Sequence, residues 1–253
     1  MRILLFLLLL TSPLAAQWPA VQRDTVLERQ LDALARTVDG GTGIYVRHLG
    51  TGKGAVIRAD ELFPTASVVK VPILAVTFAR LEHGALKYDT VITWADSLRY
   101  GDDESLVNQL RDGAALPLNQ ATLMMITTSD NAASLLLQAL VGGGAASNEW
   151  LAANGFDSTR VNSRTPGRRP NWEQYGWGQT TPREIAEMVV RIREGKLVSP
   201  AASDQMYRHL TRIYWNDRAL SQLPPWVQVA SKQGMVSRSR AEVVLVNAPS
   251  GDY

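Results

Sequence analysis

The sequence lacks cysteine altogether, and only three of its 253 residues are histidine. Without cysteine the chain has no disulfide, no thiolate nucleophile and no cysteine-ligated zinc site. His48, His83 and His209 are far apart and form no His-Glu-x-x-His pattern, so we expect packing or surface roles for them and no bound metal or cofactor. Hydrolytic chemistry would therefore have to use serine, threonine, lysine, tyrosine or carboxylate side chains.

An excess of charge of one sign is also absent. The 26 lysine and arginine residues nearly balance the 24 aspartate and glutamate residues, which leaves a formal net charge of +2 at pH 7. This balance implies no basic surface, and we expect no nucleic acid partner. The hydrophobic fraction of 45% and the charged fraction of 20% are those of an ordinary globular protein. At this length the chain can build one large domain or two small ones.

The first residues have the three-part layout of a secretory signal peptide. Met1 and Arg2 give a short positive start, residues 3–10 are continuously apolar, and small residues follow up to Ala16. The apolar run is too short to span a bilayer, and no cysteine follows it to carry a lipid anchor. We therefore expect cleavage near Ala16 and export to the periplasm or the exterior. A buried N-terminal helix is the alternative interpretation.

Strand patterns lie at both ends of the remaining chain, and helical patterns fill the middle. We expect strands at 43–48, 55–59, 227–231 and 242–247, and helices at 26–38, 67–84, 123–126, 131–140, 182–192 and from 199 onward. This order favours an α/β (α+β) fold in which one antiparallel sheet is flanked by helices, with an all-helical lobe and a cleft between the two. The predicted division is a signal peptide at 1–16, an α/β lobe at 17–65 and 224–253, and a helical lobe at 66–223 that includes a long loop at 162–179.

The first pattern that carries chemistry is Ser67-x-x-Lys70, at the expected start of a helix. Residues i and i+3 share one face of a helix, so both side chains should point the same way. The apolar residues around Lys70 indicate a helix that is buried on most faces, and burial lowers the pKa of a lysine toward that of a useful base. Backbone N–H groups at the helix start could also stabilise an oxyanion. A solvated serine and lysine are the ordinary alternative.

Two further patterns lie later in the chain. Ser129-Asp130-Asn131 falls between two expected helices, and Lys232-Gln233-Gly234 falls at the end of an expected strand. Each is weak alone, because serine, aspartate and asparagine are common helix caps and lysine before glycine is a common strand end. All three patterns in this order form the set found in class A β-lactamases and penicillin-binding proteins, and each falls in the structural context that the set requires.

On these motifs the chain resembles the class A serine β-lactamase and penicillin-recognising serine hydrolase family over residues 42–247. The resemblance implies an active site between the α/β lobe and the helical lobe. It also implies a monomer that acts on a small molecule, either a β-lactam or a related peptidoglycan-like amide or ester. We therefore expect an exported serine hydrolase that is first acylated and then hydrolyses its own acyl-enzyme.

The resemblance also implies a role for each motif residue. Ser67 would be the acylated nucleophile, Lys70 its proton acceptor, and Ser129 the group that passes a proton to the leaving nitrogen. The remaining implied roles are Asn131 for the substrate's side-chain amide, Lys232 for its carboxylate and for support of Ser129, Gly234 and Met235 for substrate binding along the strand, the N–H groups of Ser67 and Met235 for the oxyanion, and Tyr100 for an aromatic wall. Two lysines in one cleft should also lower each other's pKa.

The sequence departs from the family pattern at two positions in and near the site. The long loop of class A enzymes carries a glutamate that activates the deacylating water, and Pro166 stands there in this chain. Glu173 lies nearby but out of register; it is the remaining candidate for deacylation, and a solvated or salt-bridged loop residue is the favoured interpretation. Gln233 replaces the usual threonine or serine, which removes a hydroxyl expected to bind the substrate carboxylate.

Two alternatives to an efficient hydrolase remain open on the sequence. Pro166 and Gln233 favour a penicillin-binding or peptidoglycan peptidase-like protein that is acylated but releases its product slowly. A non-catalytic binding module with the same fold is the other alternative. Residues 248–253 form a turn where the family continues with another strand and a helix, so we expect a truncated C-terminus, the alternative being a naturally short variant.

Overall fold

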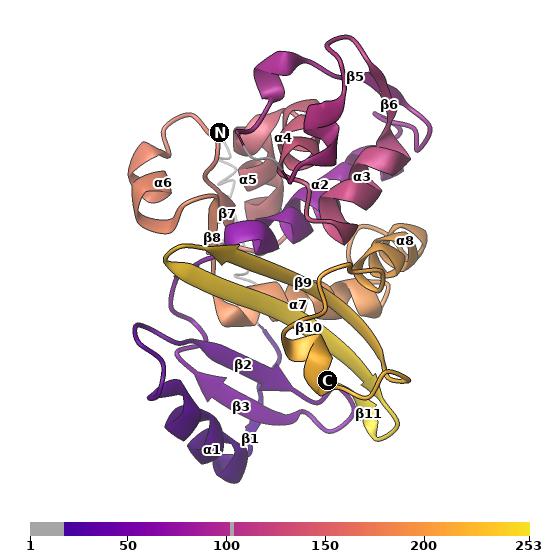
Figure 1. The fold of residues 1–253 in the computed structure, drawn as a ribbon. Helices are drawn as coiled ribbons and strands as arrows, with labels where there is room; N and C mark the ends of the chain where they lie inside the picture. The colour runs from indigo at the N-terminus through magenta and orange to yellow at the C-terminus, as the bar shows by residue number, and fades with distance from the viewer. Residues whose placement is uncertain (1–17, 102–103) are drawn as a thin grey trace, which may run out of the picture.

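The computed structural model describes residues 18–101 and 104–253 (Figure 1). The expected signal peptide lies outside these residues. The helices of the described part are α1 Thr25–Ala35, α2 Lys70–Glu82, α3 Leu118–Thr127, α4 Asn131–Leu140, α5 Gly143–Ala153, α6 Arg169–Tyr175, α7 Pro182–Arg193 and α8 Pro200–Leu210. The strands are β1 Gln22–Arg23, β2 Ile44–Arg47, β3 Lys53–Ile57, β4 Phe63–Pro64, β5 Val91–Thr93, β6 Ala115–Pro117, β7 Arg160–Val161, β8 Gly178–Thr180, β9 Gln228–Val236, β10 Ser239–Ala248 and β11 Gly251–Asp252. The predicted combination of sheet and helices is confirmed.

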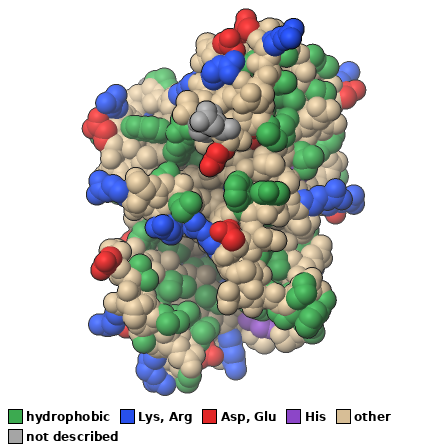
Figure 2. All heavy atoms as spheres, in the orientation of Figure 1, with side chains coloured by type: hydrophobic (Ala, Val, Ile, Leu, Met, Phe, Trp, Pro, Cys, Tyr) green, Lys and Arg blue, Asp and Glu red, His purple; other side chains and the backbone are tan. Residues whose placement is uncertain are grey.

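The expected single antiparallel sheet is divided into two main ladders, with strand orders β1-β3-β2 and β11-β10-β9. β9 and β10 form a long antiparallel hairpin, whereas β1 pairs with β3 in parallel. The short strand β11 joins the ladders at one end, where Leu49 N donates to Asp252 O at 2.8 Å. Because β11 is only two residues long, the contact does not extend along β2 and β10. Figure 2 shows the surface hollowed between the two ladders, with hydrophobic side chains along the hollow.

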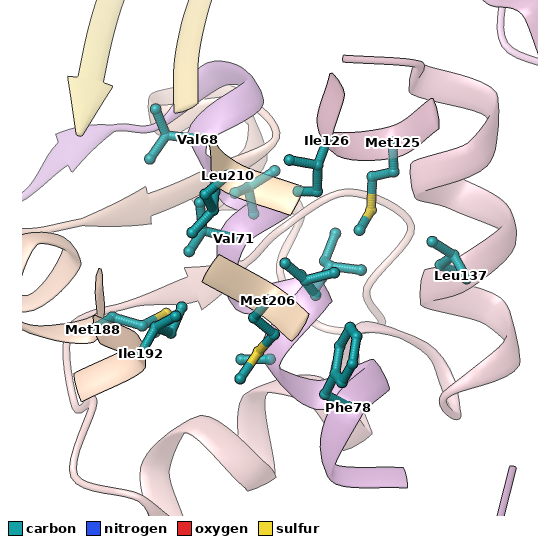
Figure 3. Packing of buried hydrophobic residues seen from close by; sticks show 14 of the residues in the cluster. Val68, Val71, Phe78, Met125, Ile126, Leu137, Met188, Ile192, Met206 and Leu210 are labelled. Atoms are coloured by element: carbon teal, nitrogen blue, oxygen red, sulfur yellow. The ribbon is translucent and has the colours of Figure 1, made fainter. Parts of the chain in front are cut away.

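Helix α2 lies in the centre of the helical core, as its apolar sequence predicts. Residues 70–79 are all buried, so the helix has no solvent face over most of its length. In Figure 3 Val71 and Phe78 of α2 lie among side chains from four other helices. These side chains are Met125 and Ile126 of α3, Leu137 of α4, Met188 and Ile192 of α7, and Met206 and Leu210 of α8. Packing on every side fixes the position of the N-terminal end of α2, which carries Lys70.

Local structure differs from the sequence expectation in three places. The helix expected from Ser67 begins as a 3₁₀ turn, η1 Ala66–Val69, and becomes α-helical at Lys70. The predicted long loop at 162–179 contains α6, whose first turn holds Pro170, and β8. The glycines at 142–144, interpreted as the end of a helix, also begin the next one, because Gly142 adopts a left-handed conformation (φ +102°) that turns the chain into α5.

Charged side chains of both signs are scattered over the face shown in Figure 2. This distribution agrees with the nearly balanced composition. Across residues 18–101 and 104–253, no helix is both long enough and apolar enough to cross a membrane.

A buried ion pair joins β2 to α7. The Arg47 guanidinium donates from Nε and Nη2 to the Glu187 carboxylate at 2.8 and 2.7 Å, and Tyr45 Oη donates to the same carboxylate at 2.5 Å. The Arg47 and Glu187 side chains are only 10% and 3% exposed. Burial and the neighbouring carboxylate raise the pKa of Tyr45 to about 12, so its hydroxyl remains a donor.

Replacing Arg47 by alanine would leave the Glu187 carboxylate buried without its cation. We expect Arg47→Ala to lower the free energy of unfolding by about 3–5 kcal/mol. The matched control is Arg169→Ala, which removes an exposed arginine paired with Glu173 and should change the free energy by less than about 1 kcal/mol. Urea denaturation followed by circular dichroism measures both variants. Equal effects in the two variants would contradict a structural role for the buried pair.

Candidate active site

Ser67 lies in the 3₁₀ turn η1, and Lys70 begins the helix that follows it. Lys70 Nζ is 2.9 Å from Ser67 Oγ, a distance at which a proton can pass between them. The preceding residue, Ala66, has a left-handed backbone (φ +44°), a conformation that costs a non-glycine residue about 1–3 kcal/mol. The strained turn therefore brings the serine over the end of α2, as the i, i+3 spacing predicted.

The turn between α3 and α4 brings Ser129 and Asn131 to the same lysine. Lys70 Nζ lies 2.5 Å from Ser129 O, 3.1 Å from Ser129 Oγ and 2.6 Å from Asn131 Oδ1. The Lys70 side chain is fully buried, so its nitrogen exchanges water for these oxygen atoms. The structure thus gathers the first two sequence motifs around one atom.

Two side chains hold this turn in place. Asp130 is the N-cap of α4, and its carboxylate accepts from Ala133 N at 2.8 Å and from Val107 N at 3.0 Å. Ser105 Oγ accepts from the backbone nitrogens of Asn131 and Ala132 at 3.0 and 3.2 Å. The helix-cap interpretation of Asp130 is therefore correct for that residue, while its two neighbours face the lysine.

Lys232 approaches Ser129 from the opposite side. Its Nζ donates to Ser129 Oγ at 2.9 Å and to Gln233 O at 2.8 Å, and the side chain is fully buried. Burial lowers the pKa of Lys232 to about 7, and the nearby Glu242 carboxylate opposes this shift. The predicted lowering is therefore present, but desolvation is its main cause. Ser129 Oγ stands between the two lysine nitrogens.

The strand β9 runs closely past the serine. A Cβ added to Gly234 would lie 2.6 Å from both Ser67 N and Thr65 O, so only glycine allows this approach. β9 is the outer strand of its ladder, and Gln233 O points away from β10 toward Lys232. Alternate residues of a strand direct their N–H and C=O groups to the same edge, so Met235 N–H points to the same side as Gln233 O. Two backbone donors, of Ser67 and Met235, thus belong to the segments that meet here.

Tyr100 packs against the long loop. Its ring makes an edge-on contact with Trp177, with centroids 5.0 Å apart, and Trp177 also contacts Trp172. Asn108 Nδ2 donates to Tyr100 O at 2.5 Å and ties this segment to η3 (Leu106–Gln109), next to the turn that Asp130 stabilises. The predicted aromatic wall at Tyr100 stays a prediction.

The long loop brings a cation and an amide inward, and its carboxylate lies at the surface. Glu173 is the only acidic residue between 162 and 179, and it pairs with Arg169 at 2.6 Å with 61% of its side chain exposed. Arg168 donates to Asn162 Oδ1 at 2.7 Å and to Gln179 Oε1 at 2.8 Å, beside the strand β4 that leads into η1. Pro166 is exposed. The structure therefore leaves Glu173 out of the cluster around Ser67.

Sequence reasoning missed several residues that shape this region. Ser105 and Arg168 lie outside the three motifs, and nothing in their local sequence marks them. Glu242 stands opposite Gln233 on β10 and accepts from Ser231 Oγ at 2.9 Å. Cross-strand pairing is the only signal that could have placed Glu242 next to the third motif. Among the described residues no group of three or more histidine, aspartate and glutamate side chains could hold a metal ion.

The fold and the gathered residues define a mixed α/β protein with a serine–lysine site between its strand β9 and its helical core. The chain belongs to the beta-lactamase enzyme family, whose sequence pattern matches residues 26–253.

Similar proteins agree with this assignment. A β-lactamase of Streptomyces albus G is 29% identical over 184 residues, which are 68% of this chain and 56% of that relative. The match thus spans little more than half of the relative. An ancestral class A β-lactamase superposes with a TM-score of 0.78 at 27% identity, over 89% of this chain and 86% of that one. The structure of PBP-A superposes with a TM-score of 0.83 at 24% identity, over 93% and 87% of the two chains, which shows a shared fold.

The pKa of Lys232 gives the site a pH dependence. Lys232 is charged below about pH 7 and neutral above it, so its attraction for a substrate carboxylate should fall as the pH rises through this value. We expect the acylation rate ratio of a β-lactam carboxylate to its neutral methyl ester to fall about tenfold per pH unit above the pKa. Stopped-flow acylation between pH 6 and 9 measures this ratio.

The control for this measurement is Lys232→Arg. Arginine stays protonated throughout the range, so its ratio should remain level. A wild-type ratio that does not change between pH 6 and 9 would show that Lys232 does not attract the carboxylate.

Proposed function

We propose that this protein is a serine acyl-transfer enzyme that is acylated on Ser67 by β-lactams or by a related amide or ester, and that it hydrolyses the acyl-enzyme slowly. The observation that carries the proposal is the continuous contact from Ser67 Oγ through Lys70 Nζ and Ser129 Oγ to Lys232 Nζ, with separations of 2.9, 3.1 and 2.9 Å. A nucleophile, a base, a proton donor and a cation are thus in hydrogen-bonding reach of one another.

The proposed acylation follows from this contact order. Lys70 in its neutral form takes the proton of Ser67 Oγ as that oxygen attacks the carbonyl carbon. The N–H groups of Ser67 and Met235 stabilise the oxyanion, for which the close approach of Gly234 supplies the geometry. Ser129 Oγ gives its proton to the leaving nitrogen as the C–N bond breaks, and Lys70 or Lys232 returns a proton to Ser129.

Slow hydrolysis is proposed because the long loop offers no base to a water molecule. Its single carboxylate, on Glu173, pairs with Arg169 in solvent. Arg168 and Asn171 converge on Gln179 Oε1, at 2.8 and 3.2 Å, and neither a guanidinium nor an amide accepts a proton at neutral pH. A title among the structural neighbours describes PBP-A as a penicillin G acyl-enzyme, which makes penicillin G a suitable probe.

The substrate and the compartment belong to the same proposal. Lys232 would attract a carboxylate, while Gln233 brings an amide whose Oε1 is buried without a partner within the described residues. The signal-peptide pattern of residues 1–16 supports export, so that the site would meet β-lactams or peptidoglycan-like amides outside the cytoplasm. Antibiotic resistance would follow only if deacylation were fast.

Penicillin G should add to Ser67 and stay there. Intact-mass spectrometry after mixing is expected to show one covalent adduct that persists over many minutes, with peptide mapping to Ser67. Ser67→Ala should give no adduct, because it removes the attacking oxygen. Ser97→Ala, at an exposed serine outside the site, is the matched control and should be acylated like the wild type.

The other outcomes separate the alternatives. Rapid return to the free mass with release of penicilloate would identify an efficient β-lactamase and sink the slow-deacylation part of the proposal. Absence of any adduct with penicillins, cephalosporins and activated esters would favour a non-catalytic binding module.

Removing the carboxylate of Glu173 should leave deacylation unchanged. We expect the lifetime of the penicillin adduct in Glu173→Gln to lie within about twofold of the wild-type value, because exposed ion pairs contribute little to their surroundings. Arg169→Gln, which breaks the same pair from the other side, is the control. A lifetime that lengthens tenfold or more in Glu173→Gln alone would show that this glutamate does activate the water.

A further inference from the structure

Ser129 has a backbone conformation that serine does not favour. Its φ is +64°, in the left-handed region where a helix commonly ends with glycine. Thr128 N and Asp130 N both donate to Met124 O, at 3.3 and 3.2 Å, which is the bonding of a helix terminated by a left-handed residue. A non-glycine residue in this region costs about 1–3 kcal/mol, so the surrounding structure must hold it.

Part of that support comes from a segment far away in the sequence. After α8 the chain returns to the end of α3, where Tyr214 N donates to Thr127 O at 3.0 Å. The next side chain, Trp215, donates from Nε1 to Thr128 O at 2.9 Å. The two aromatic rings contact each other edge-on, with centroids 5.2 Å apart. Two consecutive carbonyls immediately before Ser129 are therefore bound by two consecutive residues of this segment.

The bond to Thr128 O acts on the peptide plane that precedes Ser129. A peptide unit is rigid and planar, so fixing its carbonyl oxygen also fixes the direction of the Ser129 N–H and limits the φ of Ser129. Lys70 fixes the following carbonyl, Ser129 O, at 2.5 Å. With both flanking carbonyls held, the Ser129 side chain is left between the two lysine nitrogens.

We propose that Trp215 is a positioning residue for Ser129: its indole N–H holds the Thr128 carbonyl and thereby keeps the Ser129 hydroxyl aligned for proton transfer to the leaving group. The inference rests on the proposed function of Ser67, Lys70 and Ser129. Trp215 touches neither the nucleophile nor the lysines in this account, and it acts only through the backbone.

The proposal makes acylation depend on the leaving group. When an amide such as a β-lactam is cleaved, the C–N bond breaks and the nitrogen must receive a proton, which Ser129 supplies. When an activated thioester is cleaved, the C–S bond breaks and the thiolate leaves without a proton. Loss of the indole N–H should therefore slow acylation by the β-lactam and leave acylation by the thioester nearly unchanged.

The test compares Trp215→Phe with Trp226→Phe. Phenylalanine keeps an aromatic ring but has no N–H donor. Trp226 is 80% exposed and lies outside the site, which makes it a matched control for the substitution itself. We expect Trp215→Phe to lower the acylation rate constant for penicillin G by about three- to tenfold, the value of one hydrogen bond, with less than a twofold change for the thioester. Trp226→Phe should change neither rate.

A second measurement does not depend on turnover. In the wild-type protein the Trp215 indole N–H should exchange with solvent more slowly than that of Trp226, although 37% of the Trp215 residue surface is exposed. In Trp215→Phe the backbone amide resonances of residues 127–130 should shift, while those of α2 remain in place.

Each outcome decides the proposal. Equal slowing of both substrates, or no slowing of the β-lactam, would overturn the alignment of Ser129 by Trp215. Fast indole exchange and unmoved resonances would overturn the hydrogen bond itself. If the wild-type protein reacts with neither substrate, the proposed function fails and the catalytic role of Trp215 fails with it, whereas the exchange experiment still decides whether Trp215 holds the turn.

Discussion

The buried nitrogen of Lys70 is the point on which the site depends. A buried amine must replace water by other hydrogen-bonding partners, and here oxygen atoms of Ser67, Ser129 and Asn131 lie within 3.1 Å of it. These oxygens come from η1, from the turn after α3 and from the first residue of α4. One atom therefore fixes three segments relative to one another, and the packing of α2 on all sides keeps that atom in place.

Both serines of the site lie in or beside strained backbone, and different parts of the fold hold each of them. Ala66, just before Ser67, is left-handed and lies against β9, where Gly234 leaves no room for a side chain. Ser129 is itself left-handed and is bound by α3, by Lys70 and by the segment at 214–215. Because such strain persists only where the surroundings impose it, the nucleophile depends on the strand β9 and the second serine depends on the helices. The chemistry needs the two parts of the fold to be packed together.

The sequence predicted the local elements of this arrangement better than its long-range contacts. The apolar run after Lys70 correctly indicated a helix buried on nearly every face, and the spacing of Ser67 and Lys70 placed them together. The separation of the strands into two ladders and the bond from Trp215 to Thr128 have no local signal, because they join residues distant in the chain. The 3₁₀ start of the helix at Ala66 follows from the close approach of β9, which the sequence around Ser67 does not reveal.

The long loop separates formation of an acyl-enzyme from its removal. All groups that the proposed acylation requires come from η1, α2, β9 and the turn after α3, and none comes from residues 162–179. Hydrolysis needs one group more, a base for water, and the family pattern supplies it from that loop. Here the loop folds around Arg168, whose guanidinium binds Asn162 and Gln179, while its single carboxylate pairs with Arg169 in solvent. Burial lowers the pKa of Arg168, yet a guanidinium titrates too far above neutrality to become a base at pH 7. The same fold can thus retain the machinery of acylation and lack that of release, because the two are carried by segments that do not share a side chain.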